Sequence, residues 1–277
     1  MAEDRSMGNR KLLAMDLDGT ILDSSGQLHE ASMRVLAALR KAGHVVSYAT
    51  GRREYDMVNF LYLYDHADYV VMNTGSIVEH EPSKQRIFEQ YVDPQTTRQL
   101  IDACNENGWQ LYVIIAEGFC LNIMTEGVAE YVGRTGVQPI LYTSADDFDL
   151  DRIEGFMTAR DSDAILAYIR SHDLPLDYFN SEPGCYDVIP RGVSKWNGIC
   201  RLAEHLGIAG EDIVTMGNWL NDMEMVVNAG VGVAVADAAP ELKEAADYVT
   251  ERTCDEDPLL DVGRDLFHLN IQELKDR

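Results

Sequence analysis

The chain has 277 residues, of which 47 are acidic and 23 basic, so its formal net charge is −24. This length fits one large domain or two modest ones, and the charge argues against binding nucleic-acid backbones or anionic lipid by bulk attraction. Five scattered cysteines without a C-x-x-C pair favour reduced thiols over disulfides or a zinc site. Because no signal-peptide pattern or membrane span is seen, we expect a cytoplasmic protein without nucleic-acid or membrane partners.

The first 82 residues alternate between strand and helix patterns. Apolar runs predict strands over residues 11–17, 44–49 and 69–72, and an amphipathic pattern predicts a helix over residues 30–42. This alternation is typical of parallel strands joined by crossover helices. We therefore expect the first part of a core domain here.

Residues 83–190 follow a different pattern. A helix is predicted over 94–107, strands over 110–115 and 119–124, and a helix–strand–strand set from residue 161 through 176 to 189. Helices beside adjacent strands are typical of an α+β domain. We predict that this segment is an insert, and that its acidic stretch ADDFDLD is a solvated loop.

The alternating pattern returns over residues 191–277. Helices are predicted over 194–206, 220–228 and 240–246, and strands over 212–216 and 231–235. Short connections between them favour a parallel sheet covered on both faces. The core is therefore expected to combine the two ends of the chain, 1–82 and 191–277.

The stretch MDLDGT places two carboxylates, Asp16 and Asp18, at the end of the first predicted strand. Like charges this close raise each other's proton affinity unless a cation lies between them. A calcium loop would need glycine and glutamate where Ile21 and Gln27 stand, whereas a simple turn capped by Asp18 remains an alternative. The pair also suits phosphoryl transfer, with Asp16 as nucleophile and Asp18 as general acid and then base. Magnesium, which prefers oxygen ligands, would relieve the repulsion.

Three further segments place polar groups at expected strand ends or helix starts. ATGR offers the Thr50 hydroxyl, and GVSK puts Lys195 at a helix start, where anions are attracted. GNWLND offers Asn218, Asn221 and Asp222 after a strand. In open parallel sheets the site lies outside the carboxyl ends of the strands, so these groups are expected to converge there.

These four segments, in this order, resemble the motifs of the haloacid dehalogenase-like phosphatases, and among them the Cof-type sugar and cofactor phosphatases. The resemblance covers nearly the whole chain, including AGVGVAVADAAPELKEAADYVT at 229–250. It implies a Rossmann-like parallel-sheet core with an inserted mobile cap, here the α+β segment 83–190. It also implies magnesium-dependent hydrolysis of a small phosphorylated metabolite, such as a sugar phosphate or phosphorylated cofactor, through an aspartyl phosphate.

The resemblance also implies a role for each matching residue. The catalytic residues are Asp16 and Asp18, and the phosphate is bound by Thr50, Gly51, Lys195 and Asn221. The metal is held by Asp16, Asp18 through its backbone carbonyl, Asn218 and, through a water, Asp222. Candidate substrate contacts are Arg52, Asn73 and Gly75 in the core, and Arg160, Tyr186 and Asp187 in the cap.

One residue departs from the family pattern, which is Gly-Asp-x-x-Asn-Asp where this chain has Asn218. A neutral amide oxygen binds a hard dication less tightly than a carboxylate does. The chain could therefore be an enzyme with weaker metal affinity, a phospho-ligand binding protein without turnover, or a protein carrying an inactivating substitution. A phosphotransferase or mutase shares every core motif. We expect a monomer or a weak homodimer.

Overall fold

The computed structural model describes residues 10–135, 137–182 and 184–272. Contacts between residues group the chain into two compact units. The first comprises Met1–Arg52, Asn59–Glu89 and Ser194–Arg277, and the second comprises Arg53–Val58 and Gln90–Val193. The boundaries expected from the sequence, at residues 82/83 and 190/191, remain predictions. Within the described ranges, no helix is both long and apolar enough to cross a membrane.

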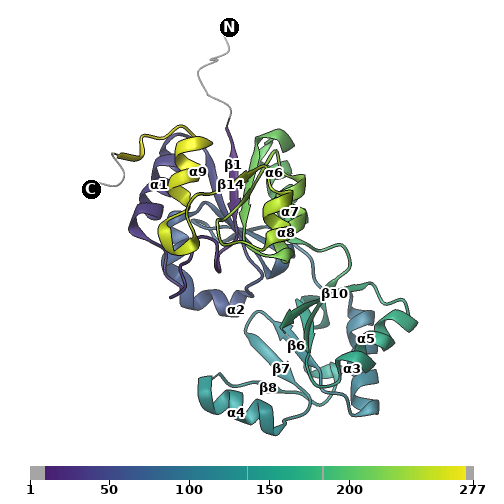
Figure 1. The fold of residues 1–277 in the computed structure, drawn as a ribbon. Coiled ribbons are helices and arrows are strands. Elements are labelled where there is room, and N and C mark those ends of the chain that lie inside the picture. The colour runs from purple at the N-terminus through teal and green to yellow at the C-terminus, as the bar shows by residue number, and fades with distance from the viewer. Residues whose placement is uncertain (1–9, 136, 183, 273–277) are drawn as a thin grey trace. The chain divides into compact units, whose positions relative to one another are not determined.

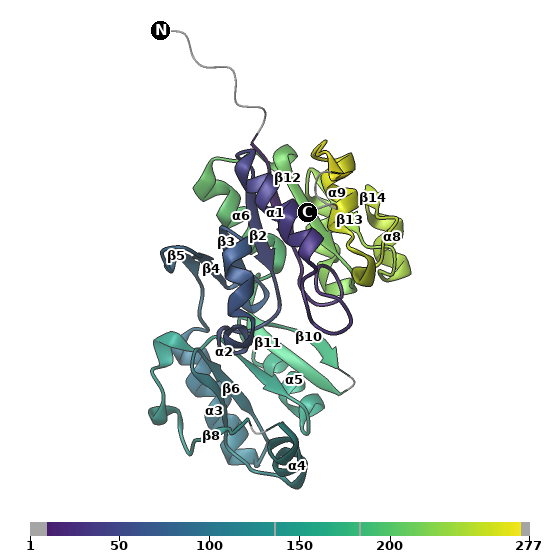
Figure 2. The same ribbon diagram turned by 90° about the vertical axis from the view of Figure 1, so that its left-hand side faces the viewer.

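The first unit is built on an eight-stranded sheet in the order β14-β13-β12-β1-β2-β3-β4-β5. The pairs from β14 to β3 are parallel, and β4 and β5 add an antiparallel hairpin at one edge (Figure 2). The strands are β1 (Leu12–Met15), β2 (Val45–Ala49), β3 (Tyr69–Met72), β4 (Ile77–His80), β5 (Gln85–Glu89), β12 (Ile213–Gly217), β13 (Val231–Ala234) and β14 (Tyr248–Val249).

The central strands are apolar because the sheet is covered on both faces. Every residue of β1, β2 and β12 is buried, as expected for parallel strands between two helical layers. Leu12 pairs with Val45 on one side and with Ile213 on the other. The expected mixed α/β class with a parallel-sheet core is confirmed.

Helices cover the sheet on both sides (Figure 1). On one face α1 packs against α9, and on the other α7 packs between α6 and α8. The helices are α1 (Glu30–Lys41), α6 (Lys195–Leu206), α7 (Met223–Asn228), α8 (Pro240–Ala245) and α9 (Leu259–Asp265), with 3-10 turns η1 (Val58–His66), η2 (Asn73–Gly75), η5 (Gly210–Asp212), η6 (Leu220–Asp222) and η7 (Cys254–Glu256). The helix predicted over 220–228 is thus a 3-10 turn followed by a short α-helix.

The second unit contains a six-stranded sheet in the order β10-β11-β9-β6-β7-β8. All its pairs are antiparallel except β7 with β8. Its strands are β6 (Tyr112–Ile115), β7 (Gly118–Leu121), β8 (Ile140–Leu141), β9 (Gly155–Thr158), β10 (Leu176–Glu182) and β11 (Cys185–Pro190). Its helices are α2 (Glu54–Met57), α3 (Pro94–Asn107), α4 (Glu126–Thr135) and α5 (Ser162–Ser171), with 3-10 turns η3 (Ala145–Asp147) and η4 (Leu150–Arg152).

The acidic stretch 145–151 is more ordered than the solvated loop expected from its sequence. It forms most of the turns η3 and η4, and the Ser144 side chain begins η3 with a capping box. Ala145 belongs to the buried core, and Phe148 and Leu150 pack against that core. The expectation is right for the four aspartates, Asp146, Asp147, Asp149 and Asp151, which are exposed, and wrong for the apolar residues between them, which are anchored to the core.

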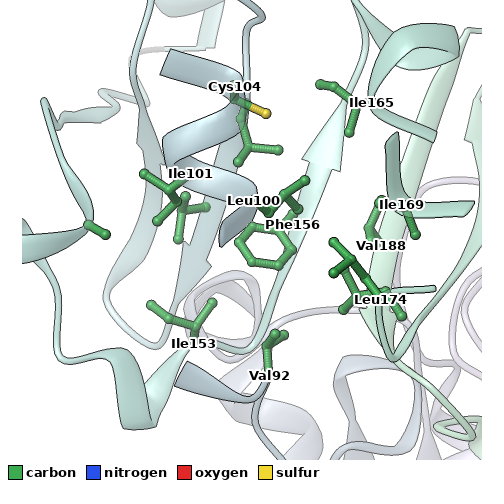
Figure 3. Packing of buried hydrophobic residues seen from close by; sticks show 14 of the residues in the cluster. Val92, Leu100, Ile101, Cys104, Ile153, Phe156, Ile165, Ile169, Leu174 and Val188 are labelled. Carbon is green, nitrogen blue, oxygen red and sulfur yellow. The ribbon is translucent and has the colours of Figure 1, made fainter. Parts of the chain in front are cut away.

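Phe156 of β9 is completely buried in the hydrophobic cluster of the second unit. Figure 3 shows its ring among side chains from α3 and α5, such as Leu100 and Ile169. Close packing leaves little room for the surroundings to collapse after truncation.

We predict that Phe156→Ala lowers the free energy of unfolding by about 3 to 5 kcal/mol, because it removes buried apolar area and leaves a cavity. Urea denaturation followed by circular dichroism measures the change. The control is Leu141→Ala on the exposed edge strand β8, where Leu141 is 62% exposed, and its effect should stay within about 0.5 kcal/mol. Equal effects of the two substitutions would contradict the assignment of this cluster as the core of the unit.

Candidate active site

A buried lysine joins two carboxylates at the carboxyl edge of the parallel sheet. The Lys195 ammonium lies 2.6 Å from Oδ1 of Asp16 and 2.7 Å from Oδ1 of Asp222. The three residues are 2%, 6% and 0% exposed. Lys195 begins α6, Asp16 follows β1, and Asp222 ends the turn after β12. Three elements far apart in sequence therefore build one ionic cluster.

Burial and charge act on this cluster in opposite directions. Burial alone lowers the pKa of Lys195, but the attraction of Asp16 and Asp222 outweighs it, and the pKa is raised. Burial raises the pKa of Asp16 to about 6, against the opposing effect of Lys195, with Asp222 and Asp18 adding to the rise. At neutral pH Asp16 is therefore mostly ionised but poorly solvated, which suits a carboxylate nucleophile.

Asp16 is fixed from both its backbone and its side chain. Its N–H donates to the Met216 carbonyl of β12 at 2.9 Å, which extends the parallel ladder past the end of β1. Its Oδ2 accepts a hydrogen bond from the Thr20 hydroxyl at 3.1 Å. Thr20 was not among the site residues predicted from the sequence. The turn signal Asp-Gly-Thr was visible, but spacing alone does not show that the threonine folds back four residues.

Asp18 has a cation of its own. The Arg52 guanidinium donates to both carboxylate oxygens, with Nε and Nη2 at 2.8 and 2.7 Å. It also lies 4.0 Å from the centroid of the Phe60 ring. The sequence suggested Arg52 as a substrate contact. The structure shows this bidentate pair with Asp18, and a bidentate fork fixes a carboxylate more sharply than a point charge does. Contact between Arg52 and the substrate remains a prediction.

The loop after β2 carries the expected phosphate-binding threonine. Thr50 is almost fully buried, and its hydroxyl accepts the Arg52 N–H at 3.0 Å. That hydroxyl keeps its own hydrogen available for an anion. The next residue, Gly51, has open space where a side chain would begin, apart from the Thr74 hydroxyl 3.7 Å away. A ligand oxygen can therefore approach this backbone closely.

Gly75 brings the turn η2 against the start of α6. Its φ is +106°, and a Cβ on it would lie 1.9 Å from the Ser194 carbonyl oxygen and 3.1 Å from the Lys195 nitrogen. Only glycine allows this approach. The Asn73 side chain, in contrast, is turned inward and donates to the Ser76 hydroxyl at 2.6 Å. Gly75 thus supports the site through its backbone.

Asp222 bonds Lys195 through one carboxylate oxygen and the loop after β12 through the other. Its Oδ2 accepts the N–H groups of Asn218 at 2.9 Å and Trp219 at 3.3 Å. Gly217 is required beside it, because a Cβ there would lie 2.5 Å from Cβ of Asp222.

Other residues of this loop are exposed. Asn221 is one of them, and its contact with phosphate remains a prediction. Trp219 is 60% exposed. It does not pack inward, although a tryptophan at the start of a helix usually does.

Carboxylate, carbonyl and amide oxygens, the kinds of atom that the predicted metal ligands offer, are what a hard divalent cation prefers. The Asn218 side chain lies against Gly19, since its Nδ2 is 2.4 Å from the position of a Cβ on that glycine. This puts a neutral amide next to the Asp18 backbone, within the motif that also holds the Asp16 carboxylate. Among the described residues, no three His, Cys, Asp or Glu side chains gather as a metal site. The predicted ligands are the Asp16 carboxylate, the Asp18 backbone carbonyl, the Asn218 amide and, through a water, Asp222, and their role in holding a metal remains a prediction.

Three candidate substrate residues lie in the second unit. Asp187 forms an ion pair with the buried Arg53, an arginine that was not among the residues predicted from the sequence. Tyr186 packs edge-on against Tyr178, with ring centroids 6.3 Å apart. Arg160 is half exposed, with its Nε 3.7 Å from Asp161. Their contacts with substrate remain predictions.

Comparison with known proteins agrees with this geometry. The family of haloacid dehalogenase-like hydrolases matches residues 13–262. YkrA of Bacillus subtilis is 30% identical over 260 residues, covering 89% of this chain and 94% of YkrA. The HMP-PP phosphatase of Cronobacter sakazakii is 25% identical over 246 residues, covering 84% and 86%. The crystal structure of a hypothetical protein from Geobacillus kaustophilus has a TM-score of 0.79 at 25% identity, covering 96% of this chain and all of its own.

The parallel sheet, with its ionic cluster at the carboxyl edge, defines an α/β protein whose charged groups gather where the strands end. The chain belongs to the haloacid dehalogenase-like hydrolases. The resemblance seen in the sequence, including its Cof-type branch, is confirmed, and so is the expectation that the chain is an enzyme of this family.

Replacing Arg52 tests whether it orients Asp18. We predict that Arg52→Lys lowers kcat about 10-fold and Arg52→Gln about 100-fold on para-nitrophenyl phosphate, because neither side chain can hold a carboxylate with a bidentate fork. The pair is partly exposed, so the melting temperature should change by less than about 2 °C. A fully active Arg52→Lys enzyme would contradict the orienting role.

Proposed function

We propose that the protein is a phosphatase that hydrolyses small phosphorylated metabolites through a phosphorylated Asp16. The observation that carries the proposal is the buried contact between Lys195 and Asp16. It keeps an ionised, poorly hydrated carboxylate at the carboxyl edge of the sheet, beside the Thr50 hydroxyl loop. Membership of the hydrolase family and the name of the Cronobacter relative support the same chemistry.

Asp16 supplies the attacking oxygen. Its Oδ1 is engaged by Lys195 and its Oδ2 by Thr20, and these contacts restrict rotation of the carboxylate. Attack on phosphorus forms the bond between an Asp16 oxygen and phosphorus and breaks the bond to the leaving oxygen. The Lys195 ammonium remains next to the site and offsets negative charge on the transferred group.

Asp18 supplies and then removes a proton. As general acid it protonates the leaving oxygen, and as general base it then takes a proton from the water that cleaves the acyl phosphate. The Arg52 guanidinium stabilises the ionised carboxylate that the first step leaves behind. Because Asp18 is 52% exposed and Arg52 28% exposed at the side chain, this pair can separate when Asp18 must carry its proton.

The remaining residues bind the phosphate. The Thr50 hydroxyl and the open backbone at Gly51 offer a hydrogen bond and close approach. A magnesium ion, when bound by the Asp16 carboxylate, the Asp18 carbonyl and the Asn218 amide, would offset the charge of the phosphate. The strongly acidic chain makes such local cations necessary for an anionic substrate.

The resemblance and the names of the relatives support a proposal for the substrate class. The Cronobacter protein is named as an HMP-PP phosphatase. For this chain we propose a sugar phosphate or a phosphorylated cofactor. A panel of phosphorylated metabolites, assayed by phosphate release and by product analysis, identifies it and separates hydrolysis from transfer within the substrate.

Asp16→Asn tests the nucleophile. We predict that it lowers turnover of para-nitrophenyl phosphate at least about 1000-fold while the protein remains folded, because an amide is a poor nucleophile of nearly the same shape. Acid-quenched wild-type enzyme should show a phosphate adduct on the peptide containing Asp16 by mass spectrometry, and the variant should show none.

The matched control is Asp65→Asn, which removes an exposed carboxylate from the same unit. It should keep wild-type turnover. Turnover by Asp16→Asn at the wild-type rate, or an adduct on another residue, would refute the proposed mechanism.

Asn218→Asp tests the metal site. We predict that restoring a charged ligand strengthens magnesium binding about 10-fold to 100-fold, or about 1.4 to 2.8 kcal/mol. Isothermal titration calorimetry of magnesium into each protein measures this directly. The magnesium concentration for half-maximal activity should fall in parallel.

Asn228→Asp adds the same charge at the end of α7 and serves as control. Its magnesium affinity should match the wild type. If the titrations of wild type and Asn218→Asp coincide, position 218 does not control the metal.

A further inference from the structure

Thr74 has a backbone conformation that a threonine rarely adopts. Its φ and ψ are +57° and +19°, in the left-handed region, between Asn73 at φ +50° and Gly75 at +106°. A β-branched side chain is strained there, whereas glycine is not. Such strain persists only where surrounding contacts impose it, and it is common at functional sites.

The contacts that impose this conformation come from the active site itself. The Asn73 N–H donates to the Arg52 carbonyl at 2.8 Å, and the Thr74 N–H donates to the Thr50 carbonyl at 3.1 Å. On its other side, Gly75 packs against the start of α6 at Ser194. Thr74 is therefore held between the Thr50 loop and the helix that carries Lys195.

The Thr74 hydroxyl faces the open side of Gly51. Its Oγ1 lies 3.7 Å from the position of a Cβ on that glycine. The residue is half-buried, and in the described ranges its hydroxyl has no protein hydrogen-bond partner. A hydroxyl without a protein acceptor, on a residue that is bonded to Thr50 through its backbone, is placed to donate to an anion.

We propose that Thr74 is a substrate-binding residue whose hydroxyl donates a hydrogen bond to a phosphoryl oxygen. This inference rests on the proposed phosphatase function and adds a contact that the sequence motifs do not predict. A glycine at position 74 would remove the backbone strain, but it would also remove the hydroxyl. Stability and phosphate affinity should therefore respond to substitution in opposite directions.

Three variants separate the hydroxyl from the backbone. Thr74→Gly removes both the strain and the hydroxyl, Thr74→Val keeps the branched shape without the hydroxyl, and Thr74→Ser keeps the hydroxyl. The readouts are the melting temperature, the inhibition constant of inorganic phosphate, and kcat and KM on para-nitrophenyl phosphate, all with magnesium present.

We expect Thr74→Gly to melt about 1 to 4 °C higher than the wild type. We also expect the inhibition constant of phosphate to rise about 3-fold to 10-fold in Thr74→Gly and Thr74→Val, the loss of one hydrogen bond, and to stay within about 2-fold in Thr74→Ser. A residue with only a structural role would lose stability and affinity together.

The inference is overturned if folded Thr74→Val and Thr74→Gly bind phosphate as tightly as the wild type. It is also overturned if Thr74→Ser loses as much affinity as Thr74→Val. Failure of the proposed function is distinct, since the wild type itself would then neither hydrolyse para-nitrophenyl phosphate nor form the Asp16 adduct. The melting temperatures show in every case whether the variants are folded.

Discussion

The site depends on one buried ammonium group placed between two buried carboxylates. Without Lys195, Asp16 and Asp222 would face each other in a region of low dielectric, where an unpaired charge typically costs several kcal/mol. Each member of the cluster comes from a different element, so the ionic contacts require β1, β12 and α6 to meet at one edge. The parallel pairing of β1 with β12 supplies that requirement, and the closely packed Gly75 sets the position of α6.

The second cation has a different physical character, and the difference suits its task. Lys195 is almost fully buried and is paired with both Asp16 and Asp222, so it can hold the nucleophile in a fixed orientation. Arg52 is paired at the rim, where water and salt weaken the attraction. A general acid must exchange a proton, and a partner that can separate allows this. The two carboxylates of MDLDGT thus have separate cations, buried to different degrees, which partly offset their mutual repulsion.

Much of this architecture could be predicted because burial leaves a direct signal. The strands β1, β2, β3, β12 and β13 are apolar runs, and the catalytic motifs follow them or begin helices. The hairpin of β4 and β5 was not predicted, because β5 is only partly buried and carries charged residues. Strand β14 was not predicted either, because it has only two residues. Contacts between distant residues were also hidden. Spacing shows that Lys195 and Asp222 are polar groups near helix starts, but not that they bond each other, or that Arg52 turns to Asp18.

At two positions of the site the chain carries a residue other than the one that a simple physical preference would favour. An aspartate at position 218 would attract a dication more strongly than Asn218 does, and a glycine would adopt the left-handed backbone of Thr74 without strain. Together, the five charged side chains of the site carry a formal charge of about −1; they are Asp16, Asp18, Asp222, Lys195 and Arg52. An aspartate at position 218 would make it about −2 and attract a dication more strongly. The same extra charge would repel a phosphate dianion. On the proposed metal site, the amide therefore exchanges metal affinity for weaker repulsion of the substrate. The Thr74 hydroxyl acts in the same direction, because it adds a donor for the phosphate without adding charge.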